Sequence, residues 1–245
     1  MKSILFSGFF VFLLQLSAIA KDFDASIFGI KSDGITLNTQ SIQKAIDLIQ
    51  EKGGGKLIFS VGKYLTGSIQ LKSNVSIELK EGAVLIGTSS FYDYVALNGN
   101  KALIVADGEK NVGIFGKGFI QGQGAAVSEQ LKIQIQKGHI KENFVEASPA
   151  LISFSNCTEV KLEGIHLQNA CGKAVNFNHC TQIKVQEIYI KNTWEKDLKG
   201  LVGLSCEDLQ LKNCYFETTG SALDLDEKSS NISKENVKNA AGKLL

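Results

Sequence analysis

Apolar and polar residues alternate through the central part of this sequence, in a pattern that occurs three times. The three copies begin at Cys157, Cys180 and Cys206, which are 23 and then 26 residues apart. Strict alternation predicts strands with one buried face, and a repeat of this length indicates a solenoid. The apolar positions of the copies are Val160, Leu162, Ile165 and Leu167; Ile183, Val185, Ile188 and Ile190; and Leu209, Leu211, Cys214 and Phe216.

This repeat predicts an all-β fold, a single-stranded right-handed parallel β-helix in which each copy forms one turn. One turn cannot bury its apolar face alone, so stacked turns supply the core. Weaker copies of the pattern occur between residues 56 and 122. We expect one β-helix domain over residues 21–245, and the 227–245 tail has too little apolar spacing for another full turn.

A helix is predicted over residues 39–52. Ile42, Ala45, Ile46 and Ile49 have the spacing of one helical face. Such a helix would cap the open end of the solenoid and cover its first strand edge.

Residues 125–149 interrupt the repeat. Insertions in solenoids lie on one face and often wall a binding groove.

The first 20 residues predict a secretory signal peptide. Lys2 precedes an apolar run from Ile4 to Leu16, and Ala18-Ile19-Ala20 fits a cleavage site after Ala20. The run is short for a membrane span, although an uncleaved anchor is the alternative. We therefore expect a secreted or periplasmic protein without membrane insertion.

The charge balance narrows the choice of partner. Once residues 1–20 are removed, 25 lysines face 25 acidic residues, and the sequence has no arginine. A neutral chain is a poor partner for nucleic acid or for an anionic membrane. It also lacks the side chain that best clamps a carboxylate through two hydrogen bonds.

Cysteine usage favours a structural role. Cys157, Cys180 and Cys206 occupy the same place in each copy, so they would form a buried ladder or a disulfide between neighbouring turns. The five cysteines include no Cys-x-x-Cys pair and there are only three histidines. We expect no metal site and no cofactor.

Several short motifs carry a family resemblance. They are Phe28-Gly29 with Asp33-Gly34, Gly53-Gly54-Gly55, Tyr64-Leu65-Thr66-Gly67, Glu81-Gly82-Ala83-Val84-Leu85 and Leu162-Glu163-Gly164-Ile165. Together they resemble glycoside hydrolase family 28, the polygalacturonase and rhamnogalacturonase family. The resemblance implies a β-helix that hydrolyses glycosidic bonds in galacturonan or rhamnogalacturonan, with inversion and without metal. The implied partner is a pectin-type, uronate-containing polysaccharide.

The sequence departs from that family where its catalytic motifs should stand. Lys199 replaces the aspartate of Asn-Thr-Asp-Gly, and Gly220-Ser221-Ala222 replaces Gly-Asp-Asp-Ala. The later histidine and arginine motifs have no counterpart. Whether the protein is an enzyme therefore stays open between a pectin-directed hydrolase, a catalytically inactive saccharide-binding homologue, and a fragment of such an enzyme.

Substitute carboxylates are available nearby. Asp224 and Asp226 alternate with Leu223 and Leu225, so they should face outward with Cα atoms about 6.6 Å apart. Inverting glycosidases hold two carboxyl groups roughly 6.5–9.5 Å apart. Asp197, from the preceding turn, is a third candidate. The alternative is that these aspartates are merely solvated at the last turn.

Two further residues are candidates for substrate binding. Trp194 either stacks on a sugar ring or covers the edge of a turn, and Lys199 stands at the family's catalytic position. Asn169 and Asn192 recur at one corner, where we expect a hydrogen-bonded ladder in preference to a substrate contact.

Overall fold

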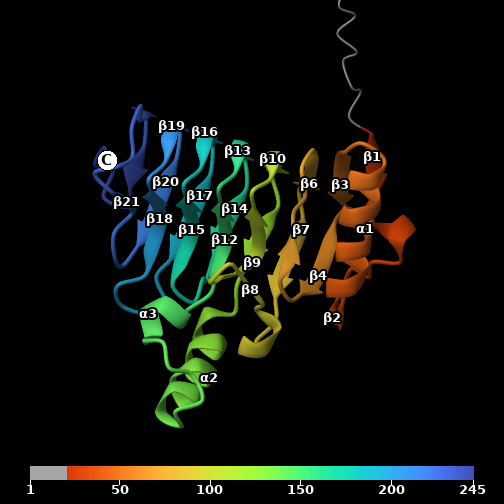
Figure 1. The fold of residues 1–245 in the computed structure, drawn as a ribbon, viewed down its shortest axis with the longest axis horizontal. Helices are drawn as coiled ribbons and strands as arrows, with labels where there is room; N and C mark the ends of the chain where they lie inside the picture. The colour runs from red at the N-terminus through yellow and green to blue at the C-terminus, as the bar shows by residue number, and fades with distance from the viewer. Residues whose placement is uncertain (1–20) are drawn as a thin grey trace, which may run out of the picture.

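Three parallel sheets form the body of the protein (Figure 1). The computed structural model describes residues 21–245, so the predicted signal peptide lies outside the described residues. From β3 onward the chain passes through sheets A, B and C in that order and repeats the circuit along one axis. This is the parallel β-helix that the alternation predicts.

The strands of each sheet come from successive turns. Sheet A contains β1 (Asp22–Asp24), β3 (Gly55–Phe59), β6 (Val75–Leu79), β10 (Lys110–Gly116), β13 (Thr158–Glu163), β16 (Thr181–Gln186), β19 (Glu207–Lys212) and β22 (Ser233–Glu235). Sheet B contains β2 (Asp33–Leu37), β4 (Gly62–Thr66), β7 (Ala83–Gly87), β11 (Phe119–Gln121), β14 (His166–Gln168), β17 (Tyr189–Asn192), β20 (Tyr215–Thr218) and β23 (Lys238–Asn239). Sheet C contains β5 (Ile69–Gln70), β9 (Asn100–Asp107), β12 (Ala150–Ser155), β15 (Lys173–Asn178), β18 (Lys199–Leu204) and β21 (Leu223–Leu225), with β8 (Ala96–Leu97) antiparallel to β9.

The predicted apolar rows stack in register. Val160 pairs with Ile183, and Ile183 pairs with Leu209. All three side chains are fully buried. Each apolar position therefore rests on the equivalent position of the next turn, and the core is continuous along the axis.

Left-handed residues turn the chain from sheet A to sheet B. Gly164, Glu187 and Asn213 occupy one corner of successive turns, with φ of 75°, 54° and 52°. The N–H of Glu187 donates to the carbonyl of Lys212 in the next turn, at 2.9 Å. The two-residue step in the sequence is thus a bend whose backbone groups bond along the stack. Glycine and asparagine suit it because they tolerate a positive φ.

Helix α1 (Thr39–Glu51) caps the N-terminal end of the solenoid, close to the predicted bounds. Its four predicted apolar residues, Ile42, Ala45, Ile46 and Ile49, are completely buried. The Gln43 side chain bonds both backbone groups of Gln70, accepting from its N–H at 2.8 Å and donating to its carbonyl at 3.1 Å.

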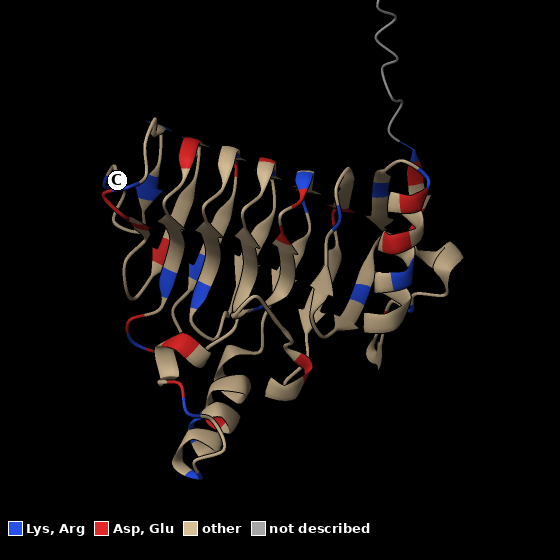
Figure 2. Ribbon diagram, viewed as in Figure 1, with Lys and Arg blue, Asp and Glu red and all other residues tan. Residues whose placement is uncertain are grey.

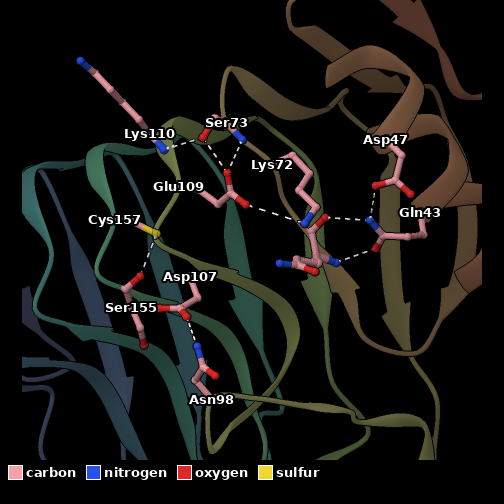
Figure 3. A network of polar contacts seen from close by, with 11 residues as sticks. Gln43, Asp47, Lys72, Ser73, Asn98, Asp107, Glu109, Lys110, Ser155 and Cys157 are labelled. Carbon is pink, nitrogen blue, oxygen red and sulfur yellow. Dashed lines mark hydrogen bonds and ion pairs between the residues drawn. The ribbon is translucent and has the colours of Figure 1, made fainter. Parts of the chain in front are cut away.

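A polar network fastens the edge where sheet C passes into sheet A (Figure 3). Glu109 Oε2 accepts from the backbone N–H and the hydroxyl of Ser73, at 2.8 and 2.6 Å. The Ser73 hydroxyl oxygen in turn accepts from the N–H of Lys110 at 3.0 Å. Glu109 therefore ties two consecutive turns together.

The 125–149 insertion folds as two helices between β11 and β12. They are α2 (Gly124–Gln136) and α3 (Phe144–Ala147), which project below the sheets in Figure 1. Val127 and Leu131 anchor α2 in the core. Gln130 accepts from the N–H of Phe91 in the short helix η2 (Phe91–Asp93) at 3.1 Å.

A second short helix, η1 (Ala25–Phe28), follows β1. Across residues 21–245 we find no helix with the length and apolar character needed to cross a membrane.

The tail covers the C-terminal end of the solenoid. The sequence predicts too little apolar spacing for another full turn here, yet β22 and β23 pair with β19 and β20. Val237 is buried, and its carbonyl accepts from the N–H of Leu245 at 3.0 Å. Two side-chain hydrogen bonds, from Asn231 to Asp208 and from Asn236 to Asn213, also join the tail to the preceding turn.

Candidate functional site

The outer face of sheet C, which we call the sheet C face, carries a row of residues in register that is polar except at Val202. Ser153 pairs with Asn176, Asn176 with Val202, and Val202 with Asp224. Their strand neighbours point into the core, so this row lies on the outer side of the sheet, where Ser153, Asn176 and Val202 are nevertheless buried and Asp224 is partly exposed. Asn176 donates to the Ser153 hydroxyl at 3.1 Å.

Two loops border the entry to sheet C. The α2–α3 insertion leads from β11 into β12, and residues 193–198 lead from β17 into β18. The two loops touch, because a Cβ on Gly124 would lie only 2.6 Å from Nε1 of Trp194. As expected for a solenoid, the insertion is therefore placed beside one sheet face.

Trp194 covers the edge of a turn, one of the two roles that the sequence left open, and its stacking on a sugar stays a prediction. Its Nε1–H donates to the carbonyl of Ala170 at 2.7 Å, which covers the edge of the preceding turn. Its side chain also lines a hollow of about 320 Å³ with Asn169 and the Gln121–Ala126 segment. A half-buried indole at such a hollow can contact a ligand without losing its own hydrogen bond.

Asp224 is on the sheet C face and is ion-paired. Its Oδ2 lies 2.5 Å from Nζ of Lys199, and each side chain is about two-fifths exposed. The structure thus joins one catalytic candidate to one substrate-binding candidate.

Asp226 is engaged in the turn that follows. Its Oδ1 accepts from the N–H groups of Ser205 and Ser229, at 2.9 and 3.0 Å, and from the Ser229 hydroxyl at 2.7 Å. These bonds, led by that of Ser205, lower the pKa of the carboxyl. Hydrogen bonds to the ionised form have this effect, and they make the group a poor proton donor near neutral pH.

Asp197 lies beside the Gly220 turn. It has a φ of 57°, and a Cβ on Gly220 would come within 2.7 Å of its carbonyl carbon. Asp197 is exposed, and the close approach places its backbone against the turn that leads to Asp224.

Lys173 was missed by the sequence analysis and lies beside Lys199. The two residues are register partners on β15 and β18, about 4.8 Å apart along the sheet. Burial, then the neighbouring charge of Lys199, lowers the pKa of Lys173, while Asp224 acts in the opposite direction. Lys173 stands 26 residues before Lys199, so repeat alignment could have found it.

A break in alternation explains why Lys173 is outside. Ala174 and Val175 are consecutive residues, yet both lie in the main core. Leu151 and Ile152 do the same one turn earlier. If strict alternation continued back from Val175, the side chain of Lys173 would point into the core.

Asn169 and Asn192 do not bond each other as the expected ladder required. Asn192 is buried and donates to the carbonyls of Gly172 and Lys199, at 2.9 and 3.3 Å. Asn169 lines the hollow beside Trp194. The reason is that Asn169 takes a left-handed conformation with a φ of 57°, which turns it out of the strand.

The five cysteines are all buried thiols. Cys157 donates to the carbonyl of Ser155 at 3.2 Å, and Cys180 to that of Phe154 at 3.3 Å. The ladder interpretation fits this arrangement, since no disulfide links these cysteines in the described chain. Within residues 21–245, no three acidic, histidine or cysteine side chains gather as a metal site would require.

Comparison with known proteins assigns the family. Residues 54–243 match the profile of Glycosyl hydrolases family 28. The chain belongs to this family.

Its relatives include polygalacturonases. An exo-poly-α-D-galacturonosidase from Dickeya chrysanthemi is 30% identical over 65% of this chain, which spans only 27% of that relative. A crystal structure from Parabacteroides merdae, described as a candidate glycosyl hydrolase, is 44% identical. It has a TM-score of 0.87, and the match covers 91% of this family 28 chain and 100% of that one.

A more distant structure supports the fold. The exopolygalacturonase from Thermotoga maritima is 21% identical with a TM-score of 0.73, over 89% of this chain and 60% of that one. The solenoid is accordingly a right-handed parallel β-helix, as predicted.

We expect Asp226→Asn to destabilise this family 28 protein at neutral pH but not in strong acid. Because the folded-state pKa lies below the ordinary 3.8, the carboxylate stabilises the fold above that pH, and the contribution disappears as pH falls through the folded value. Thermal unfolding followed by circular dichroism from pH 7 to pH 2 measures the difference.

The control for this series is Glu227→Gln, at an exposed neighbouring position. A deficit in Asp226→Asn that stays constant over the whole pH range would contradict the assigned role.

Proposed function

We propose that this family 28 protein binds a pectin-type, uronate-containing polysaccharide along the sheet C face. The observation that carries the proposal is the pair of neighbouring lysines, Lys173 and Lys199, with only Asp224 opposite them. Membership in a family with polygalacturonase members supports the choice of polymer.

The charges at this point favour an acidic sugar. Lys199 is neutralised by Asp224, whereas Lys173 forms no ion pair within the described chain. A half-buried ammonium group without a counter-charge is stabilised by any anion that reaches it. A uronate carboxylate supplies such an anion once in every acidic unit of the polymer.

The surroundings match a polysaccharide better than other anionic polymers. In the view of Figure 2, acidic and basic segments are interspersed over the strands, with no extended run of basic segments. Nucleic acid binding depends on many phosphate contacts at once. A single cationic point beside polar side chains and Trp194 suits a sparsely charged, hydroxyl-rich chain.

Hydrolysis is a second candidate, supported by the named polygalacturonase relatives and by Asp224 on the sheet C face. Inversion requires a carboxylic acid and a carboxylate on opposite sides of the bond. Asp226 is committed to its turn, so Asp224 and Asp197 are the pair that would have to act. The geometry supports binding more directly than it supports this pair.

Lys173→Met should weaken binding of a short oligogalacturonate about tenfold, because a charge-assisted contact contributes roughly 1.5–3 kcal/mol. Isothermal titration calorimetry at low salt measures the affinity. Added salt should reduce the difference in affinity between Lys173→Met and the unmodified protein.

Lys44→Met is the matched control, since Lys44 is exposed on the cap helix α1, several turns along the solenoid from Lys173. Equal affinities for Lys173→Met and the unmodified protein would refute the proposed site.

Sugar release separates binding from hydrolysis. For a binding protein, we expect Asp224→Asn to leave the release of reducing ends from polygalacturonate at the level of the unmodified protein. A carboxylate that transfers protons would instead reduce release about 10²–10⁴-fold on substitution. That loss, with Kd for the oligosaccharide preserved, would establish the hydrolase candidate.

We further propose that residues 1–20 direct export and are removed. Lys2, the apolar run and the Ala18-Ile19-Ala20 site support this. Amino-terminal sequencing of protein recovered from the periplasm or medium should begin at Lys21. Intact Met1 in the exported protein would contradict cleavage.

A further inference from the structure

A second hollow lies on the outer face of sheet A, a different side of the solenoid. It has a volume of about 550 Å³ and is formed over β3, β6, β10 and β13. We call it the sheet A hollow. Its volume falls within the range of small-ligand sites, roughly 300–1,000 Å³.

Small residues between two lysines create the depression. Along one outward row, Lys56 pairs with Ser76, Ser76 with Gly113, and Gly113 with Lys161. The two lysines form the ends of the hollow, and the two small residues leave space between them.

Phe115 forms the floor of the sheet A hollow. It belongs to the next outward row, between Glu78 and Glu163. A Cβ on Gly113 would lie 2.5 Å from Cζ and 2.7 Å from Cε2 of the Phe115 ring. The ring therefore lies back over Gly113 and along the strand, and it remains half-buried.

Backbone conformation does not account for Gly113. The residue is in a strand, and its φ is outside the left-handed region that favours glycine. The absence of a side chain at Gly113 instead leaves room for the Phe115 ring, so the glycine allows an aromatic surface to form the floor of the hollow.

The charges around the ring leave hydrogen-bonding groups at one end. Lys56 is ion-paired with Glu78 at 3.0 Å and with Asp22 at 3.5 Å. Lys161 and Glu163 are exposed and make no ion pair within residues 21–245. Lys117 and Glu187, also on the lining, are likewise exposed and unpaired within those residues, so two cationic donors and two anionic acceptors stand free beside the aromatic floor.

We propose that the sheet A hollow binds one pyranose ring of a polysaccharide, with the ring's C–H face on Phe115 and its polar substituents on Lys161 and Glu163. A flat aromatic surface with a few polar groups at its rim suits a sugar, which has one apolar face and a hydroxyl-rich edge. The lining acids and lysines balance in number, which disfavours a phosphate-rich ligand.

This inference takes only the ligand class from the proposed function; the site is on another sheet. The polar substituent that contacts Lys161 and Glu163 is either a neutral hydroxyl or a uronate carboxylate.

Amide-resolved NMR titration tests the sheet A hollow separately from the sheet C face. The probes are a short oligogalacturonate and a neutral galacto-oligosaccharide. We expect the amide signals of Gly113, Phe115 and Glu163 to shift in a saturable manner. Lys173→Met should leave that binding curve unchanged, so failure of the proposed function would appear only in the sheet C signals.

Gly113→Ala is the decisive variant, because the added Cβ must displace the Phe115 ring from its position over residue 113. The backbone conformation at residue 113 remains allowed for alanine. We expect the Kd of the sheet A hollow to rise about tenfold. Phe115→Leu should give a similar loss, and Tyr215→Leu, on sheet B at the far end of the solenoid, should have no effect. Unshifted signals at unrelated amides show that each variant is folded.

The outcomes are distinct. Shifts with both probes support recognition of the ring face itself. Shifts with oligogalacturonate alone assign Lys161 to a carboxylate and also support the site. If neither probe shifts these amides, or if Gly113→Ala binds as tightly as the parent, the proposed site is wrong.

Discussion

The backbone hydrogen bonds between successive turns are the constraint on which the structure depends. They hold equivalent residues about 4.8 Å apart along the axis, so each side chain packs against its own counterpart in the next turn. Val160, Ile183 and Leu209 show the result in the core. A mutation in such a row disturbs two interfaces at once, since each turn supports both neighbours.

The same register arranges the outer surface. A strand that buries alternate residues must display the others, and the register copies this display from turn to turn. Lys173 and Lys199 become neighbours on sheet C, and Ser76 and Gly113 become neighbours on sheet A. Both proposed binding sites are therefore products of pairing between turns, and neither could exist on a single repeat.

The sequence predicts the parts of the fold that depend on periodicity. Alternation in the three clear copies leads to the β-helix, and one apolar stripe leads to α1. The tail was harder, because Val237 is its only fully buried apolar residue and asparagine bonds supply much of its attachment. Composition alone does not reveal such bonds.

The candidate site was predicted less completely, for a physical reason. Alternation fails at the start of the sheet C strands, where Ala174 and Val175 both turn inward. The face on which Lys173 lies depends on that local break. The role of Asp226 depends on Ser205, a residue 21 positions earlier in the chain that only the completed turn brings close.

The substitutions at the family's catalytic positions alter what the sheet C face can do. An ionised carboxylate at the position of Lys199 would repel a uronate. In an enzyme, a carboxyl group there is useful despite this repulsion because it transfers a proton. A lysine there attracts the same ligand and has no proton-transfer task at this point. Its ammonium group is ion-paired with Asp224, which engages the carboxylate that the hydrolase candidate would use. Under the proposed function, the lysine at this position therefore serves the retention of an acidic polymer at the sheet C face.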